Sequence, residues 1–154
     1  MLAAGASTRY GGVKQREFLP AVLAALGQTS VTEIVVVEGA HSLELSGVRV
    51  VPCPEWDRGP GVSLRCGLAA LGADVDRALI VLADGPDLDP RAVERVLASE
   101  EPVAAASYDG TRSHPVAIAR SAWATVPDEG GRALDPVLVD CSDLQPPGDV
   151  DEPR

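Results

Sequence analysis

The sequence of 154 residues contains very little lysine and few aromatic residues. Lys14 is the only lysine, so every other position among the 13 lysines and arginines is an arginine. Aromatic residues make up 3% of the chain, although 45% of it is hydrophobic. The core must therefore consist mainly of Val, Leu, Ile and Ala. Such a core is typical of packed parallel strands and helices, and it disfavours an aromatic-rich β-sandwich.

Net positive charge and long apolar runs are also lacking. The formal net charge is −10 at pH 7, which argues against duplex nucleic acid or an anionic membrane as a partner. No stretch approaches the roughly 20 apolar residues of a membrane-spanning helix, and the N-terminus does not resemble a signal peptide. A nucleotide is compatible with this charge, because a local basic patch, backbone N–H groups and a metal ion can hold a small anion.

Cysteine is scarce, and its positions give no obvious pairing. Cys53, Cys66 and Cys141 form no C-x-x-C pair, and any disulfide scheme leaves one of them unpaired. We therefore expect free thiols and a cytoplasmic protein.

Short aliphatic runs alternate with helical patterns along the chain. Runs of strand length lie at residues 33–38, 48–51, 77–83, 102–107, 114–119 and 136–140. Helical patterns lie at residues 18–26 and 62–71, after the pair Asp89-Pro90, and at residues 121–125. This order predicts one α/β domain over residues 1–154, with a mostly parallel open sheet and helices on both faces.

Local signals refine three of these helices. Pro20 is tolerated only in the first turn of a helix, so it should lie near the start of the first one. Leu64, Leu68 and Leu71 are expected to form one apolar stripe in the second helix. Asp89 is expected to cap the third helix, with Pro90 at its first helical position.

Open α/β sheets bind ligands beyond the carboxyl ends of their strands, and the opening stretch MLAAGASTRYGGVK is such a place. Gly5 and Gly11 let backbone N–H groups approach phosphate, Ser7 offers a hydroxyl, and Arg9 and Lys14 add positive charge. The stretch is not a P-loop, which needs glycine directly before its lysine, and it lacks G-x-G-x-x-G. An ordinary turn between a strand and a helix, with a solvated lysine, is the alternative.

The pattern Leu-Ala-Ala-Gly-x-Ser-x-Arg-x-Gly-x-x-Lys, residues 2–14, resembles the signature loop of the MobA/MocA-like nucleotidyltransferases. The resemblance implies a Rossmann-like three-layer fold of the nucleotide-diphospho-sugar transferase type. It also implies transfer of a nucleoside monophosphate from an NTP to a phosphorylated acceptor such as molybdopterin. The Ala-Ala-Gly form resembles the cytidylyl-transferring branch, so CTP is the expected donor, with GTP as the other possibility.

Five further segments resemble family motifs in the same order along the chain. They are residues 59–67 (GPGVSLRCG), Asp84-Gly85-Pro86, Gly110 to Pro115, residues 129–132 (EGGR) and Asp149 to Pro153. Four of them also have an ordinary structural explanation: a helix start at 59–67, a turn aspartate at 84, a His-Pro turn at 114–115 and an acidic tail at 149–153.

The resemblance implies a role for each matched residue. The catalytic residues would be Arg9, Lys14 and Asp84, and Asp84 and Asp151 would hold Mg²⁺. The nucleotide would be bound by Leu2, Ala3, Ala4, Gly5, Ser7, Arg9, Gly11, Lys14, Gly61 and Ser63. His114 and Arg132 would lie on the acceptor side.

Two departures from the family pattern affect the nucleotide site. Only Met1 precedes Leu2, so the opening strand is expected to be shorter than usual, and the segment between Lys14 and the first helix is also short. Two alternatives follow. One is a relative repurposed for redox chemistry, as in proteins similar to nicotine-blue oxidoreductase, and the other is a catalytically weak nucleotide-binding module.

Overall fold

The computed structural model describes residues 1–6 and 14–148, and for Lys14 the backbone only. Strands and helices follow one another in the order predicted from the sequence. The strands are β1 (Leu2–Ala3), β2 (Val35–Glu38), β3 (Arg49–Pro52), β4 (Arg77–Ile80), β5 (Val103–Tyr108), β6 (Thr111–Ala119) and β7 (Val137–Asp140). The helices are α1 (Lys14–Leu26), α2 (Pro60–Ala70) and α3 (Pro90–Leu97), with 3-10 turns η1 (Trp56–Arg58), η2 (Arg120–Thr125) and η3 (Gly131–Ala133).

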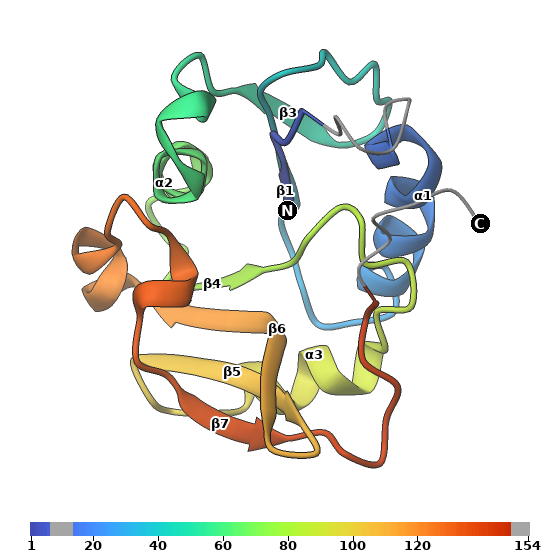
Figure 1. The fold of residues 1–154 in the computed structure, drawn as a ribbon, viewed down its shortest axis with the longest axis vertical. Coiled ribbons are helices and arrows are strands. Elements are labelled where there is room, and N and C mark those ends of the chain that lie inside the picture. Colours follow the sequence, from blue (N-terminus) through green and yellow to red (C-terminus); the bar gives the residue numbers. More distant parts are fainter. Residues whose placement is uncertain (7–13, 149–154) are drawn as a thin grey trace.

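The strands form two sheets that meet at β1 (Figure 1). The first sheet, in the order β1-β2-β3, is entirely parallel. The second, in the order β4-β6-β5-β7, is mixed: β6 runs antiparallel to β4 and β5, whereas β7 runs parallel to β5. An isolated parallel bridge between Leu2 and Leu82 links the two sheets. The predicted α/β class is confirmed. Strand β6 is the one that runs antiparallel to its neighbours.

Helices cover both faces of the sheets, and the alternation along β2 shows why. Val35 and Val37 point to one face, where they pack with Val62 of α2. Val36 points to the other face and packs with Leu19 of α1. Because successive side chains of a strand point to opposite faces of the sheet, β2 packs against α2 on one face and against α1 on the other. All five of these residues are buried.

Helix α1 begins four residues earlier than the sequence pattern predicted, at Lys14 instead of residue 18. Pro20 consequently lies inside the helix and not in its first turn, so that expectation was wrong. Its side chain is exposed, which places the proline ring on the solvent side, away from the packed face. Helix α3 matches its prediction: Asp89 caps it by accepting a hydrogen bond from the Arg91 backbone N–H at 2.8 Å.

The expectation of three free thiols was wrong for two of them. Cys53, which follows β3, and Cys66 of α2 form a disulfide with their Cα atoms 6.0 Å apart. Thirteen residues separate them in sequence, and the packing of α2 beside β3 brings them together. Cys141 is free and buried.

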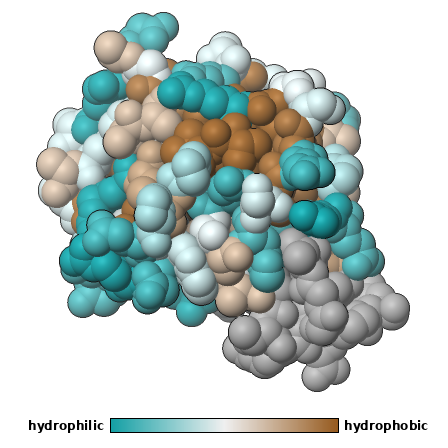
Figure 2. All heavy atoms as spheres, turned by 90° about the horizontal axis from the view of Figure 1, so that it is seen from above, coloured by the Kyte–Doolittle hydropathy of each residue, from teal (hydrophilic) through white to brown (hydrophobic). Residues whose placement is uncertain are grey.

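The core is aliphatic, as the composition predicted, and apolar side chains also reach the surface. Val137 and Leu138 of β7 are each 48% exposed. Seen from above, the surface carries one contiguous hydrophobic area among hydrophilic residues (Figure 2). Within residues 1–6 and 14–148, no helix is long and apolar enough to cross a bilayer.

Candidate functional site

A cavity of about 640 Å³ lies where the two sheets meet. It is bordered by β1 through Leu2 and by the start of α2 through Pro60. His114, Arg132 and Gly85 also line it. The cavity therefore joins five of the segments that the sequence singled out, although they are up to 130 residues apart along the chain.

The end of β1 is fixed by a glutamine that the sequence analysis did not single out. Ala3 and Ala4 are buried, and Gly5 is exposed at the end of the strand. The Gln15 side chain is buried and donates a hydrogen bond from Nε2 to the Gly5 carbonyl at 2.8 Å. The first turn of α1 thereby holds the point at which the chain leaves the sheet.

The start of α2 approaches the segment at residues 127–128 with no room for a side chain. A Cβ on Gly61 would fall on the Pro127 carbonyl oxygen and within 2.8 Å of the Asp128 carbonyl. The Gly61 N–H donates to the Asp128 carbonyl at 3.0 Å. Ser63, in the first turn, is buried. These two predicted nucleotide-binding residues therefore lie together beside the cavity wall formed by Pro60 and Leu64.

Asp84 follows the strand segment that continues β4, and it is half-buried in a turn. Its neighbour Gly85 lies against the C-terminal segment: a Cβ there would meet Pro147 Cβ at 3.2 Å and the Gly148 carbonyl at 3.4 Å. The Asp87 N–H donates to the Pro147 carbonyl at 3.1 Å. Glycine at position 85 thus lets the C-terminal segment pack on the turn that carries Asp84.

His114 lies between groups of opposite charge. Burial, which is the largest cause, and the positive charges of Arg132 and Arg112 together lower the pKa of His114 to about 4, whereas Asp84 opposes them. The imidazole is therefore neutral at pH 7 and can donate or accept hydrogen bonds without adding charge. The same electrostatic contacts show that predicted residues from the metal side and the acceptor side lie near one another.

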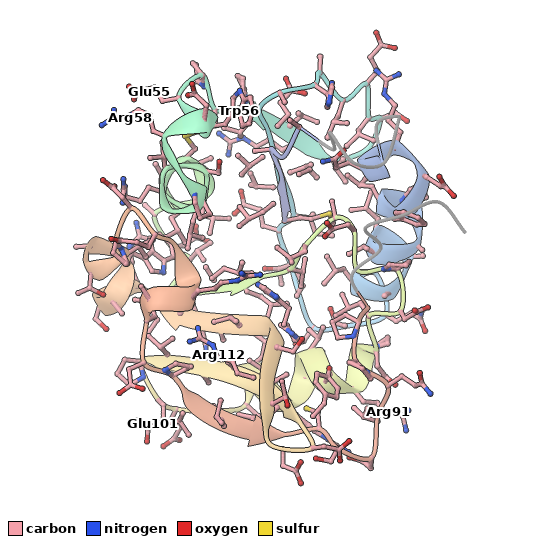
Figure 3. All side chains as sticks on the ribbon, in the orientation of Figure 1. Glu55, Trp56, Arg58, Arg91, Glu101 and Arg112 are labelled. Carbon is pink, nitrogen blue, oxygen red and sulfur yellow. A yellow bond between two sulfur atoms is a disulfide. The ribbon has the colours of Figure 1, made fainter. Side chains whose placement is uncertain are left out.

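Arg132 is exposed at the cavity, at the centre of η3. In the part of the chain that the structure describes, its guanidinium has no hydrogen-bond or ion-pair partner. The turn around it is held by Arg112 of β6, which donates hydrogen bonds to the carbonyls of Gly131, Arg132 and Leu134. Arg112 reaches from β6 toward this turn (Figure 3).

A second arginine holds the beginning of the same segment. Arg65 of α2 donates to the Val126 carbonyl at 2.9 Å and to Asp128 Oδ1 at 2.5 Å. Residues 126–134, which we call the bridging segment, are thus anchored to α2 at one end and to β6 at the other. The segment connects the predicted nucleotide side with the predicted acceptor side.

Several predicted residues lie outside the described part of the chain. These are Ser7, Arg9, Gly11, the side chain of Lys14, and Asp151. Among the described residues, no group of three His, Cys, Asp or Glu side chains could hold a metal ion by itself. A carboxylate such as Asp84 still suits Mg²⁺, because this ion is usually bound by one or two carboxylates together with substrate phosphates and waters.

Two residues at the site were missed by the sequence analysis, for different reasons. Gln15 could have been found if the helix had been started at Lys14, because Gln15, Leu19, Val22 and Leu26 then share one face. Arg112 gives no such signal, because its three acceptors are backbone carbonyls 19 to 22 residues away.

A profile of the MobA-like NTP transferase domain matches residues 1–134. The chain belongs to this family. The resemblance to the family is therefore confirmed, and the matched region covers β1 to η3 with both anchors of the bridging segment, but not β7 or the cavity residues Pro147 and Gly148. No curated protein gives a significant match.

Solved structures share the fold of this MobA-like chain. An Rv0371c homologue from Mycobacterium sp. strain JC1 superposes with a TM-score of 0.81 at 21% identity, covering 99% of this chain and 88% of that one. Rv0371c from Mycobacterium tuberculosis H37Rv gives 0.79 at 24% identity, with 98% and 90% covered. A nucleotidyl transferase from Methanothermobacter thermautotrophicus gives 0.68 at 22% identity, with 84% and 75% covered.

Proposed function

We propose that this MobA-like NTP transferase moves CMP from CTP onto a phosphorylated small-molecule acceptor such as molybdopterin and releases pyrophosphate. The observation that supports the proposal best is the cavity itself. It is lined by Leu2 of β1 and by Pro60 at the start of α2, together with Arg132 and with His114, which is neutral at pH 7. A donor nucleotide and an anionic acceptor could thus meet within one cavity.

Nucleotidyl transfer asks the protein mainly to align two substrates and to offset charge. An acceptor phosphate oxygen forms a bond to the α-phosphorus, and the bond from the α-phosphorus to the bridging oxygen breaks, so that pyrophosphate leaves. Arg9 and Lys14 would stabilise the charge on the triphosphate. Ala3, Ala4 and Gly5 would lie against the base and ribose, and Gly61 and Ser63 would approach the base.

Asp84 and Asp151 would hold the divalent metal ion. When bound, such an ion offsets negative charge on the phosphates and orients them. Pro147 and Gly148 lie against Gly85, and Asp151 is three residues beyond Gly148, a length of chain that spans at most about 10 Å. Rv0371c has been crystallised with manganese, which supports a divalent metal in a protein of this fold.

The proposal is tested by mass-detected transfer from an equimolar mixture of CTP and GTP, with Mg²⁺, to reduced molybdopterin. We expect a cytidylylated product and pyrophosphate. Asp84→Ala and Lys14→Ala should each lower the rate by about two orders of magnitude or more. Asp74→Asn is the matched control, because Asp74 is an exposed carboxylate outside the cavity lining.

Near-normal pyrophosphate release by both Asp84→Ala and Lys14→Ala would refute the assigned roles. A thermal-shift panel separates the alternatives, because a ligand that binds the folded state raises its melting temperature. Stabilisation by CTP with Mg²⁺ supports the transferase, whereas stabilisation by NAD(P)H alone would favour redox chemistry. CTP binding without transfer to any acceptor would indicate a binding module.

A further inference from the structure

Arg112 makes an unusual set of contacts for an arginine at a charged site. Its Nη1 donates to the Leu134 carbonyl at 2.8 Å and to the Arg132 carbonyl at 3.2 Å, and its Nη2 donates to the Gly131 carbonyl at 2.5 Å. All three acceptors belong to η3 and the residue that follows it. One guanidinium therefore holds the turn through three backbone oxygens, of which the Gly131 carbonyl also accepts from the Leu134 N–H at 3.2 Å.

The charge of Arg112 is not neutralised by these contacts. Carbonyl oxygens are neutral acceptors, and in residues 1–6 and 14–148 no carboxylate lies within ion-pair distance of Arg112. Burial lowers the pKa of Arg112, but an arginine stays protonated in proteins. Arg112 and Arg132 thus bring two positive charges to the cavity lining, which also contains the carboxylate of Glu129.

We propose that Arg112 is a positioning residue for the acceptor: it fixes η3 so that Arg132 faces the cavity, where the Arg132 guanidinium meets an anionic, phosphate-bearing group. The inference rests on the proposed function, because it assigns this part of the cavity to the acceptor. Arg112 acts through the turn that it holds, and Arg132 is the group that contacts the ligand.

The geometry requires the forked shape of arginine. Two terminal nitrogens in one plane reach three carbonyls spread over four residues. A lysine ammonium carries similar charge on a single atom and lacks this planar fork. Arg112→Lys therefore separates the role of the shape from the role of the charge.

Arg65 anchors the other end of the bridging segment, so different arginines hold its two ends. Its contacts with Val126 and Asp128 hold the segment to α2, next to Gly61. Arg112 holds the part that carries Arg132. Loss of Arg112 should therefore weaken the acceptor side and leave nucleotide binding largely intact.

The experiment compares the intact protein with Arg112→Met and Arg112→Lys. The control is Arg120→Met, because Arg120 also donates to backbone carbonyls, those of Gly72 and Val75, but lies away from the cavity. Three quantities are measured: hydrogen exchange of the amides at residues 131–134, the affinity for inorganic phosphate reported by the His114 ring NMR signal, and the thermal shift caused by CTP with Mg²⁺.

In Arg112→Met we expect amide exchange about tenfold faster at residues 131–134 and phosphate affinity about tenfold weaker, because the lost hydrogen bonds free the turn. The CTP-dependent thermal shift should stay close to that of the unaltered protein. Arg112→Lys should also exchange rapidly and recover only part of the phosphate affinity. Arg120→Met should match the unaltered protein in all three measurements.

Three results would overturn the inference. They are unchanged exchange in Arg112→Met, full recovery of phosphate affinity in Arg112→Lys, and absence of any phosphate effect on His114 in the unaltered protein. If Arg112→Met does not fold, the same three measurements on Arg112→Lys test the inference. A lack of CTP stabilisation in the unaltered protein would refute the proposed function alone, because the phosphate measurement uses no nucleotide.

Discussion

Gly61→Ala is a sharp test of the contact between α2 and the bridging segment. Replacing glycine by alanine inside a helix ordinarily stabilises a protein by up to about 1 kcal/mol, through helix propensity. The structure predicts the opposite sign, because the new Cβ would fall on the Pro127 carbonyl oxygen. Relief requires the backbone of residues 127–128 to move, which also weakens the hydrogen bond from Gly61 to Asp128.

The expected loss can be worked out from these two contributions. Overpacking costs about 1–3 kcal/mol, and the weakened hydrogen bond adds about 1 kcal/mol. For a domain of this size, each kcal/mol shifts the melting temperature by roughly 2–4 °C, so we expect a fall of roughly 5–15 °C. The assay is thermal and urea unfolding at neutral pH.

Gly131→Ala is the matched control for this comparison. No atom lies within 4 Å of a Cβ built on Gly131, so its melting temperature should stay within about 2 °C of the unaltered protein. A Gly61→Ala protein that melts at or above the temperature of the unaltered protein would refute the argument.

Two further predictions concern His114 and the disulfide. Because burial lowers the pKa of His114 to about 4, its ring NMR signal should titrate well below the value near 6.5 of the unfolded chain. Below about pH 6.5 the unfolded chain binds a proton at His114, whereas the folded protein does so only near pH 4. The free energy of unfolding should therefore fall by on the order of 3 kcal/mol as the pH is lowered from about 6.5 toward 4. Titration near 6.5 in the folded protein would contradict this. Reduction of the bond between Cys53 and Cys66, separated by 13 residues, should lower stability by about 3 kcal/mol. Non-reducing mass spectrometry detects the bond, and its absence after purification without reductant would contradict the pairing.

Much of the fold could be predicted because strand and helix patterns are local. The run at β2 is apolar on every residue of its buried part, since it faces α2 on one side and α1 on the other. The start of α1 could not be predicted as easily. Pro20 argued for a later start, and its position on the exposed face of the helix depends on packing that the sequence pattern does not show.

The candidate site was only partly predictable for the same reason. The sequence identified His114 and Arg132 through a family resemblance, and the structure places both at one cavity. The disulfide and the contacts of Arg112 depend on how distant segments pack. Neither the spacing of Cys53 and Cys66 nor the residues around Arg112 carries that information.

The way in which the bridging segment is held affects how the protein could evolve or be redesigned. Arg112 binds this segment entirely through main-chain oxygens, and Arg65 does so in part. Apolar side chains at both ends of the segment add to this anchoring by packing into the core. Glu129 and Arg132, which both line the cavity, can be exchanged without loss of the hydrogen bonds that hold the loop. Positions 129 and 132 are therefore the ones at which a small library could alter the cavity lining on an unchanged scaffold.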